Sequence, residues 1–490
     1  MKRLSLRGAL AAMLLAATLP GLGSAWPAFA DEGFTFFMSP EDEQRIGDEE
    51  HPKILARFGG AYDDGAIGAY VAEIGARLAR YSARPDIAYR FTVLNSPVVN
   101  AFALPGGYVY VTRGLIALCN NEAELAGVLG HEIAHVTARH AAQRYSQAVT
   151  FGLGALALGW LFGDRGIGEI AEVGGELFLQ SYSREHEYEA DLLAVRTLAR
   201  AGYAPLAQAA FLASLEQHGA LENEIAGRPG AERARDLFAT HPRTVDRVER
   251  AIAEANEQPV DPVYRRDAFL DRIDGMLYGD DPAQGFVRGQ RFNHPSLRVG
   301  FEAPADFRLV NTAEAVLAQG PAGAVMRFDQ ETDRRKVRAA RGPVDYLRRV
   351  WGARVEIKDA AAITINGLSA ATGRARVEGR QGLVDLRPVV IAHDDRFFRF
   401  LFVSSPDMTN RLADDFSRAA NSFHVLSARE LAALRPLKLR IAPVTAADSD
   451  ERFAAALPFG DRQLARFRAL NGLRPNEAIA PGQRVKLVGE

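Results

Sequence analysis

The 490-residue sequence contains a single cysteine, Cys119. A chain with one cysteine cannot form an internal disulfide, so this fold has to be held by its packed core instead. Cys119 ends the apolar run 115–119. Because a free cysteine in such a run usually behaves as a small hydrophobic residue, we expect Cys119 to be buried.

A strong excess of either charge is also missing. Lysines and arginines number 59 against 61 acidic residues, a formal net charge of -2. Loss of the first thirty residues would remove three cations and no acid, which leaves -5 for the remaining chain. We interpret the chain as mildly acidic and without a basic block, which argues against nucleic acid as a partner.

Neither of the main apolar runs reaches the roughly 20 residues that cross a bilayer. The first, 10–19, follows a basic start and precedes Ala28-Phe29-Ala30. This is the layout of a secretory signal peptide, so we predict residues 1–30 as a signal peptide cleaved before Asp31, with Ala25 as the other candidate site. No cysteine follows the run until Cys119, which excludes a bacterial lipoprotein anchor.

The second apolar run, 148–163, is sixteen residues long and contains four glycines. Glycine weakens an isolated helix, and polar residues flank the run closely. We therefore interpret 148–163 as a buried or membrane-touching helical hairpin rather than a span, which makes it a candidate for membrane-surface contact.

The remaining chain is long enough for two or three domains. The whole sequence is 48% hydrophobic and 24% charged, which is typical of a soluble globular protein. Helical spacing of apolar residues predicts a helix over 67–81. Extended runs at 91–94, 99–104 and 108–112, with the turn Pro105-Gly106-Gly107, predict a hairpin that leads into a helix capped by Asn121.

Beyond residue 258 the sequence predicts three further segments. An irregular linker is expected at 259–291, then an α+β accessory domain at 292–427 with strands near 297–301, 323–328, 383–391 and 397–403 and a helix at 410–422. No catalytic spacing is recognisable in this domain, so a binding or structural role is expected. A small module is predicted at 437–490.

The most informative motif is His131-Glu132-Ile133-Ala134-His135. On a helix, positions i and i+4 share a face, so both imidazoles can reach one metal ion, and neutral imidazole suits Zn²⁺. Glu132 lies beside that face, where its carboxylate can take a proton from water as a peptide carbonyl is attacked. The pattern predicts a zinc peptidase.

A third protein ligand is needed, and spacing alone does not select it. The metzincin continuation is absent. That pattern needs glycine at position 138 and histidine at position 141, but both are alanine, and His140 is one position short. The later segment 182–191 offers several carboxylates. Glu187 and Asp191 are four residues apart, so one could bind metal while the other orients an imidazole. From spacing, the rivals of Glu187 are Glu185 and Glu189.

The His131–His135 motif, followed by Ser-Arg-Glu-His-Glu-Tyr-Glu-Ala-Asp at 183–191, resembles the zinc metallopeptidase family of CAAX prenyl endopeptidase and HtpX. Within it, the periplasmic branch of the β-barrel assembly-enhancing protease is the most similar. The resemblance covers about 39–255. It implies a mostly helical, gluzincin-type domain over 31–258 with a small edge-strand sheet, one Zn²⁺ per chain, and Glu187 as third ligand.

The resemblance implies further roles around the zinc ligands His131, His135 and Glu187. His241, in Thr240-His241-Pro242, is expected near the metal, either as a catalytic residue or in the open coordination position. Asp191 and Arg184 are expected to support the ligands. The substrate is expected to add as a strand along an edge strand made of Asn100, Ala101, Phe102, Ala103 and Leu104.

The C-terminal segment, 437–490, resembles a LysM-like module through Leu470-Asn471-Gly472-Leu473 and 479–487, which implies peptidoglycan as a candidate partner. It departs from that pattern at 448–450 and at Pro458 and Gly460. The central domain is faintly similar to the α+β module of related exported peptidases.

These features lead to one expected function and one alternative. The first is a periplasmic zinc endopeptidase that cuts unfolded or misassembled envelope proteins. The alternative is an envelope chaperone or peptidoglycan-tethered binding protein whose metal site is latched or weakly active.

Overall fold

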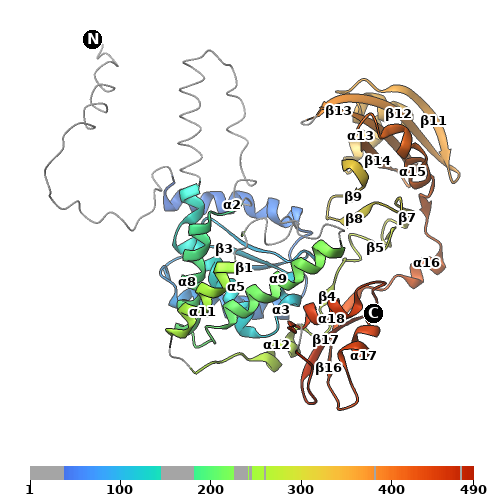
Figure 1. Cartoon of the computed structure of the whole chain (residues 1–490). Coiled ribbons are helices and arrows are strands. Elements are labelled where there is room, and N and C mark those ends of the chain that lie inside the picture. The colour runs from blue at the N-terminus through green and yellow to red at the C-terminus, as the bar shows by residue number, and fades with distance from the viewer. Residues whose placement is uncertain are drawn as a thin grey trace, which may run out of the picture.

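A computed structural model describes residues 38–144, 181–225, 241, 245–258, 261–379, 382–474 and 477–490. The predicted signal peptide (1–30) and the apolar run 148–163 lie outside the described residues. Figure 1 shows an N-terminal unit (described residues of 38–258), a strand-rich central unit (286–425) and a C-terminal unit (437–490).

The N-terminal unit contains a three-stranded sheet with the order β1-β3-β2. Strand β1 (Arg90–Leu94) runs parallel to β3 (Tyr108–Thr112), and β2 (Ala101–Leu104) runs antiparallel to β3. The β2–β3 hairpin turns at Pro105-Gly106-Gly107. A Cβ on Gly106, whose φ is +79°, would lie 2.8 Å from the Cα of Gln44, so only glycine fits. The predicted hairpin is present, and β2 is its outer strand.

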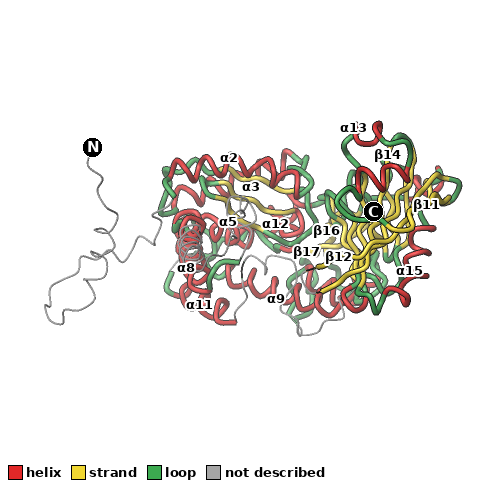
Figure 2. Tube along the Cα trace, turned by 90° about the horizontal axis from the view of Figure 1, so that it is seen from above, coloured by secondary structure: helices red, strands yellow, loops and turns green. Residues whose placement is uncertain are grey.

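Helices surround this sheet (Figure 2). Those of the N-terminal unit are α2 (Pro40–Arg57), α3 (Gly65–Tyr81), α4 (Arg113–Leu118), α5 (Glu122–Thr137), α8 (Arg184–Arg200), α9 (Ala207–Ile225) and α11 (Val245–Asn256). The side chain of Asn121 caps α5 by accepting the backbone N–H of Glu124. Every residue of α5 from Glu122 to Val136 is buried. The reason is that α3, α8, α9 and β2 all pack against it.

The C-terminal unit has the element order strand, helix, helix, strand. It consists of β16 (Leu437–Pro443), α17 (Asp450–Ala455), α18 (Gln463–Leu470) and β17 (Arg484–Gly489). Strands β16 and β17 are antiparallel, and a third strand, β4 (Leu277–Tyr278), pairs with β16. Both helices, α17 and α18, precede the turn at Gly472.

The predicted linker, 259–291, is a structured segment. It contains α12 (Arg266–Ile273), β4 and β5 (Phe286–Arg288). Phe269 and Leu270 of α12 belong to the same apolar core as Leu129 of α5 and Leu439 of β16. The expectation of an irregular linker was wrong because the partner of β4 lies about 160 residues further along the chain, where no local pattern reveals it.

The central unit has a core of its own, rich in phenylalanine. Its larger sheet has the order β11-β12-β13-β14-β10-β9-β8, and a smaller sheet has the order β15-β7-β6-β5. The strands are β5, β6 (Arg291–His294), β7 (Val299–Glu302), β8 (Arg308–Asn311), β9 (Val316–Gln319), β10 (Val325–Gln330), β11 (Lys358–Ile365), β12 (Leu368–Gly379), β13 (Gly382–His393), β14 (Arg396–Ser404) and β15 (His424–Val425).

Four short helical segments and one longer helix complete the central part of the chain. They are η2 (Pro321–Gly323), α13 (Arg334–Ala339), α14 (Pro343–Tyr346), η3 (Leu347–Trp351) and α15 (Thr409–Asn421). The apolar side of α15, with Leu412 and Phe416, packs into the phenylalanine-rich core. The last short helix, α16 (Ala428–Ala433), connects this unit to β16. No helix in the described part of the chain combines the length and apolar character needed to cross a membrane.

Candidate metal centre

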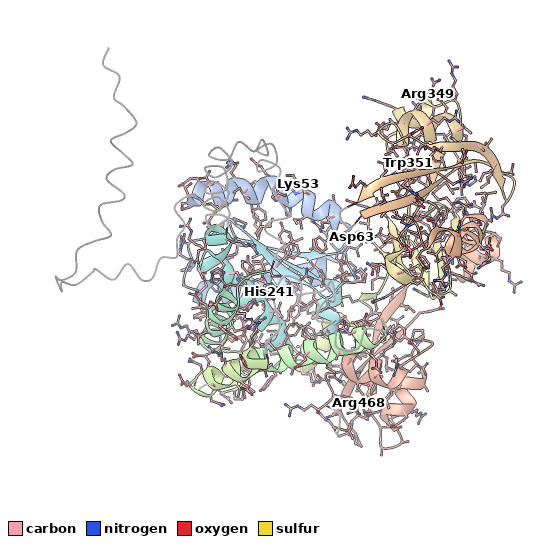
Figure 3. The ribbon with its side chains drawn as sticks, turned by 45° about the horizontal axis from the view of Figure 1, so that its top comes forward. Lys53, Asp63, His241, Arg349, Trp351 and Arg468 are labelled. Carbon is pink, nitrogen blue, oxygen red and sulfur yellow. The ribbon has the colours of Figure 1, made fainter. Side chains whose placement is uncertain are left out.

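Helix α5 presents His131 and His135 on one face. Their Nε2 atoms lie 3.0 Å apart, and the two side chains are 5% and 1% exposed. The spacing of four residues in the sequence therefore produces the paired imidazoles that were expected. Figure 3 shows His241 in the middle of the same unit.

Helix α8 brings Glu187 to these imidazoles. Its carboxylate oxygens lie 3.5 Å from the Nε2 atoms of His131 and of His135, and the side chain is 1% exposed. Glu185, by contrast, is exposed, and Glu189 contacts His140 through Oε2 at 3.2 Å. Of the four carboxylates that spacing left open, Glu185, Glu187, Glu189 and Asp191, Glu187 is therefore the one that the fold places in the cluster.

His241 completes a four-residue group. Its Nδ1 atom lies 2.8 Å from Glu187 Oε1 and 3.3 Å from His131 Nε2, while its Nε2 atom lies 3.4 Å from Glu132 Oε1. All four potential ligand atoms of His131, His135, Glu187 and His241 lie within 4.8 Å of one another. His241 thus lies between the other three residues of the group and Glu132.

The donor group fits a zinc ion. Nitrogen and oxygen ligands of tetrahedral Zn²⁺ lie about 2.0–2.1 Å from the metal, hence about 3.3 Å from each other. The contacts within the group of His131, His135, Glu187 and His241 range from 2.8 to 3.5 Å. Two buried atoms near it, Glu132 Oε2 and His241 Nε2, have no hydrogen-bond partner among the described residues. Such atoms are expected where a metal and its water belong.

Asp191 and Arg247 hold the ligands in position. Asp191 Oδ1 lies 2.9 Å from His131 Nδ1, so this carboxylate can fix the imidazole with its Nε2 toward the group. Arg247 of α11 donates to Asp191 and lies 2.7 Å from Glu187 Oε2. Gln208 also donates to Asp191.

Arg184, expected in this supporting role, is instead exposed at the first turn of α8. The guanidinium that reaches Glu187 and Asp191 belongs to Arg247 of α11. Helix α11 is anchored mainly by Ala251 and Ala255, whereas Ile252 is 41% exposed. A helix far along the chain can supply a positioning residue without any local spacing signal.

Burial and neighbouring charges shift the pKa values of this group. Burial raises the pKa of Glu132, as a general base that works near neutral pH requires. Burial opposes ionisation of Glu187, but the charges of His241 and Arg247 outweigh it and hold its pKa well below the usual range. For Asp191, burial is likewise outweighed by Arg247, and its pKa falls to about 2. Both carboxylates are therefore ionised.

A second layer of aromatic side chains supports His135. The ring of Tyr182 stacks on it at 4.0 Å, and His140 Nδ1 lies 2.8 Å from His135 Nδ1. His186 stacks on His140 at 4.2 Å. Tyr182 was not recognised from the sequence, because no spacing rule links it to the histidine motif.

The predicted substrate strand lies next to this centre. Ala103, Leu104, His135 and Tyr182 all line one small cavity of about 10 Å³. Asn100, just before β2, donates its backbone N–H to Thr112. However, the residues of β2 are only 0–3% exposed. A substrate strand could therefore pair with β2 only after the parts of the protein that bury this strand move.

Residues 68–255 match the model of peptidase family M48. The chain carries a peptidase family M48 domain. This agrees with the resemblance inferred from the histidine motif and the segment 183–191, and members of this family use a metal cofactor.

Similar curated proteins match different shares of the chain. The β-barrel assembly-enhancing protease of Escherichia coli is 28% identical over 58% of this chain and 62% of its own length. A putative protease of the same name from Vibrio cholerae is 31% identical over 44% of this chain and 45% of its own. The mitochondrial metalloendopeptidase OMA1 of Arabidopsis thaliana is 32% identical over 35% of this chain and 32% of its own length. The chain thus spans less than two thirds of the length of these relatives.

Among solved structures, cyanobacterial PsbP from Synechocystis is covered over 98% of its length and matches 30% of this chain. The TM-score is 0.21 and the identity 15%, which is too low to support an argument.

Proposed function

We propose that the protein is an exported zinc metalloendopeptidase that hydrolyses unfolded or misassembled envelope proteins. The observation that carries this proposal is the buried group of His131, His135 and Glu187 with Glu132 beside it, inside a family M48 domain. The envelope substrates and the periplasmic location rest on the names of the relatives and on the signal-peptide pattern at 1–30.

In this proposal His131, His135 and Glu187 hold the zinc, which when bound would activate water and polarise a peptide carbonyl. Glu132, with its pKa raised by burial, accepts the proton of the attacking water and returns it to the leaving amine. Asp191 keeps His131 in the tautomer that binds metal, and Arg247 keeps Asp191 and Glu187 ionised and aligned.

The test compares the purified mature protein with and without a metal chelator, using casein and a β-barrel protein as unfolded substrates. We expect about one zinc per chain and chelator-sensitive cleavage. Chelator-insensitive cleavage that persists in Glu132→Gln would contradict the mechanism, and a chain without metal would contradict the ligand set.

We further propose that His241 occupies the open zinc position at rest. This is supported by its 2.8 Å contact with Glu187 and by the burial of β2, which together describe a closed site. Substrate then binds only after His241 moves, and the basal activity of the protein is low. The same features favour the second candidate function, an envelope chaperone or tethered binding protein with a latched site.

His241→Ala tests the latch. With the position open, a metal-centred hydroxamate inhibitor should bind more tightly while zinc is retained. The cleavage rate itself is a poor readout, because His241 also lies near Glu132 and its loss removes any help to the intermediate. Retained zinc with unchanged inhibitor affinity would show that His241 does not gate the site.

The C-terminal unit is proposed as a LysM-like module with peptidoglycan as a candidate partner. Support comes from its strand-helix-helix-strand order and from the motif 470–473. Co-sedimentation of the mature protein with purified sacculi tests this. If no more protein sediments with sacculi than without them, peptidoglycan is removed as a partner.

A further inference from the structure

The helical layer of the central unit carries a concentration of positive charge that the whole-chain charge of -2 hides. Between Asp333 and Arg354 there are eight lysines and arginines and only two carboxylates. The expectation of a chain without a basic block was therefore wrong. All eight cations are exposed: Arg334, Arg335, Lys336, Arg338, Arg341, Arg348, Arg349 and Arg354.

This layer has an inner apolar side. Tyr346 and Leu347 are buried against Ala371, Val390 and Phe397 of the large sheet. The helices α13, α14 and η3 are thus fixed on the sheet by their apolar residues, and the cations are left on the outer side. We call this outer side the basic face, residues 333–354.

The two carboxylates within the basic face are already engaged. Asp345 pairs with Arg349 at 3.1 Å, and Asp333 caps α13 by accepting the backbone N–H of Arg335. In the part of the chain that the structure describes, none of the other seven cations forms an ion pair. Beneath the face, Arg327 and Arg399 are paired with Asp329 and Glu331, so these two cations and two carboxylates balance, whereas the charges of the basic face do not.

Half-buried apolar residues lie among the cations. Val344, Val350 and Trp351 are each partly exposed, and the guanidinium of Arg399 lies 5.3 Å from the ring centroid of Trp351. Tryptophan beside arginine and lysine is the composition found at the boundary between water and lipid. Figure 3 shows Arg349 and Trp351 on the upper part of the central unit, away from both His241 and Arg468, so a flat surface can approach this face.

From these observations we propose that the basic face docks the protein on an anionic membrane surface through phosphate-bearing lipid headgroups. Its charges are spread over α13, η3 and the connecting residues Arg341 and Arg354 rather than gathered around one point, which suits a surface of many dilute phosphates. Binding is expected to be reversible and salt-sensitive, since exposed charges are screened within about a Debye length. It does not depend on the proposed protease activity.

The experiment is flotation of the full mature chain with phosphatidylcholine vesicles, with and without phosphatidylglycerol. We expect binding only to vesicles that contain phosphatidylglycerol, and loss of it at high salt. Each cation near such a surface contributes about five-fold in affinity, so Arg334→Ala with Arg335→Ala and Lys336→Ala should weaken binding on the order of 100-fold.

Two controls keep the result interpretable. Arg57→Ala with Arg80→Ala and Arg200→Ala removes three exposed cations from the N-terminal unit and should leave binding unchanged. Arg334→Lys with Arg335→Lys keeps the charge and should bind like the wild type, because a lipid surface reads charge rather than guanidinium geometry. Equal binding to neutral vesicles, an unaffected triple alanine variant, or loss of binding in the lysine variant would each overturn the proposal.

Discussion

The two ends of helix α5 both bury charge, but they do so in different ways. In the first turn, Glu124 accepts hydrogen bonds from Asn120 and Asn121, and the amino group of Lys486 lies close by. In the later turns, His131 and His135 face Glu187 and His241. One helix thus reaches from the candidate metal centre to the contact with the C-terminal unit around Glu124 and Lys486, which we call the junction.

At the junction, the buried charge is satisfied by the protein. Lys486 is 0% exposed, and its Nζ donates to the carbonyl oxygens of Ala117, Leu118 and Cys119 at 2.6–3.1 Å. These carbonyls end helix α4, where unpaired acceptors and the negative end of the helix dipole favour a cation. At the metal centre, Glu132 Oε2 and His241 Nε2 instead have no such partner among the described residues. The amino group at the junction thus has its acceptors within the protein, whereas these two atoms at the candidate metal centre have no partner in the part of the chain that the structure describes.

The largest effect is expected at the end of α5 that carries the candidate metal centre. Glu132→Gln should keep zinc and folding but lower peptide cleavage by about 10²–10⁴-fold or more, because the general base is lost. Zinc content, the melting temperature and casein cleavage check this together. Cleavage at the wild-type rate by a folded, zinc-containing variant would remove Glu132 from the mechanism.

The ligand set is tested next. Glu187→Ala should lose zinc, whereas Glu185→Ala, which changes an exposed residue, should keep about one zinc per chain. Glu189→Ala should also keep it, since Glu189 contacts His140 and not the metal group. Metal analysis of the three purified variants decides, and full zinc occupancy in Glu187→Ala would refute the assignment.

At the junction the expected effect is on stability. Lys486→Met leaves three buried carbonyls without their donor and should reduce the free energy of unfolding by about 3 kcal/mol. Cleavage per folded molecule should be retained, because the metal group is untouched. Urea unfolding measures the first quantity, and Lys438→Met, on the half-exposed neighbouring strand, should change it by less than about 0.5 kcal/mol. A loss of zinc in Lys486→Met would show that the two ends of α5 are coupled.

The smallest effect concerns the cap of α5. Asn121→Ala removes the side chain that accepts the Glu124 N–H at 2.9 Å and should cost about 1 kcal/mol. Activity should again be unchanged. Thermal unfolding at constant zinc detects this, and an effect as large as that of Lys486→Met would mean that the cap also holds the junction together.

Local patterns in the sequence predicted the features that depend on neighbouring residues. The periodicity of an α-helix placed His131 and His135 on one face, and an asparagine before Glu122 predicted where α5 begins. The alternation of 108–112 and the Pro-Gly-Gly turn predicted the hairpin. Spacing left four carboxylates open as the third ligand, and family resemblance rather than periodicity selected Glu187.

What the sequence by itself determined is thus the chemistry of α5 and the elements next to it, because those follow from a fixed helical or strand repeat. Tertiary structure alone decided that Arg247 rather than Arg184 supports the ligands and that Lys486 closes the end of α4. It also decided that β4 joins β16. These contacts join residues from tens to hundreds of positions apart, and packing, which no local repeat encodes, brings them together.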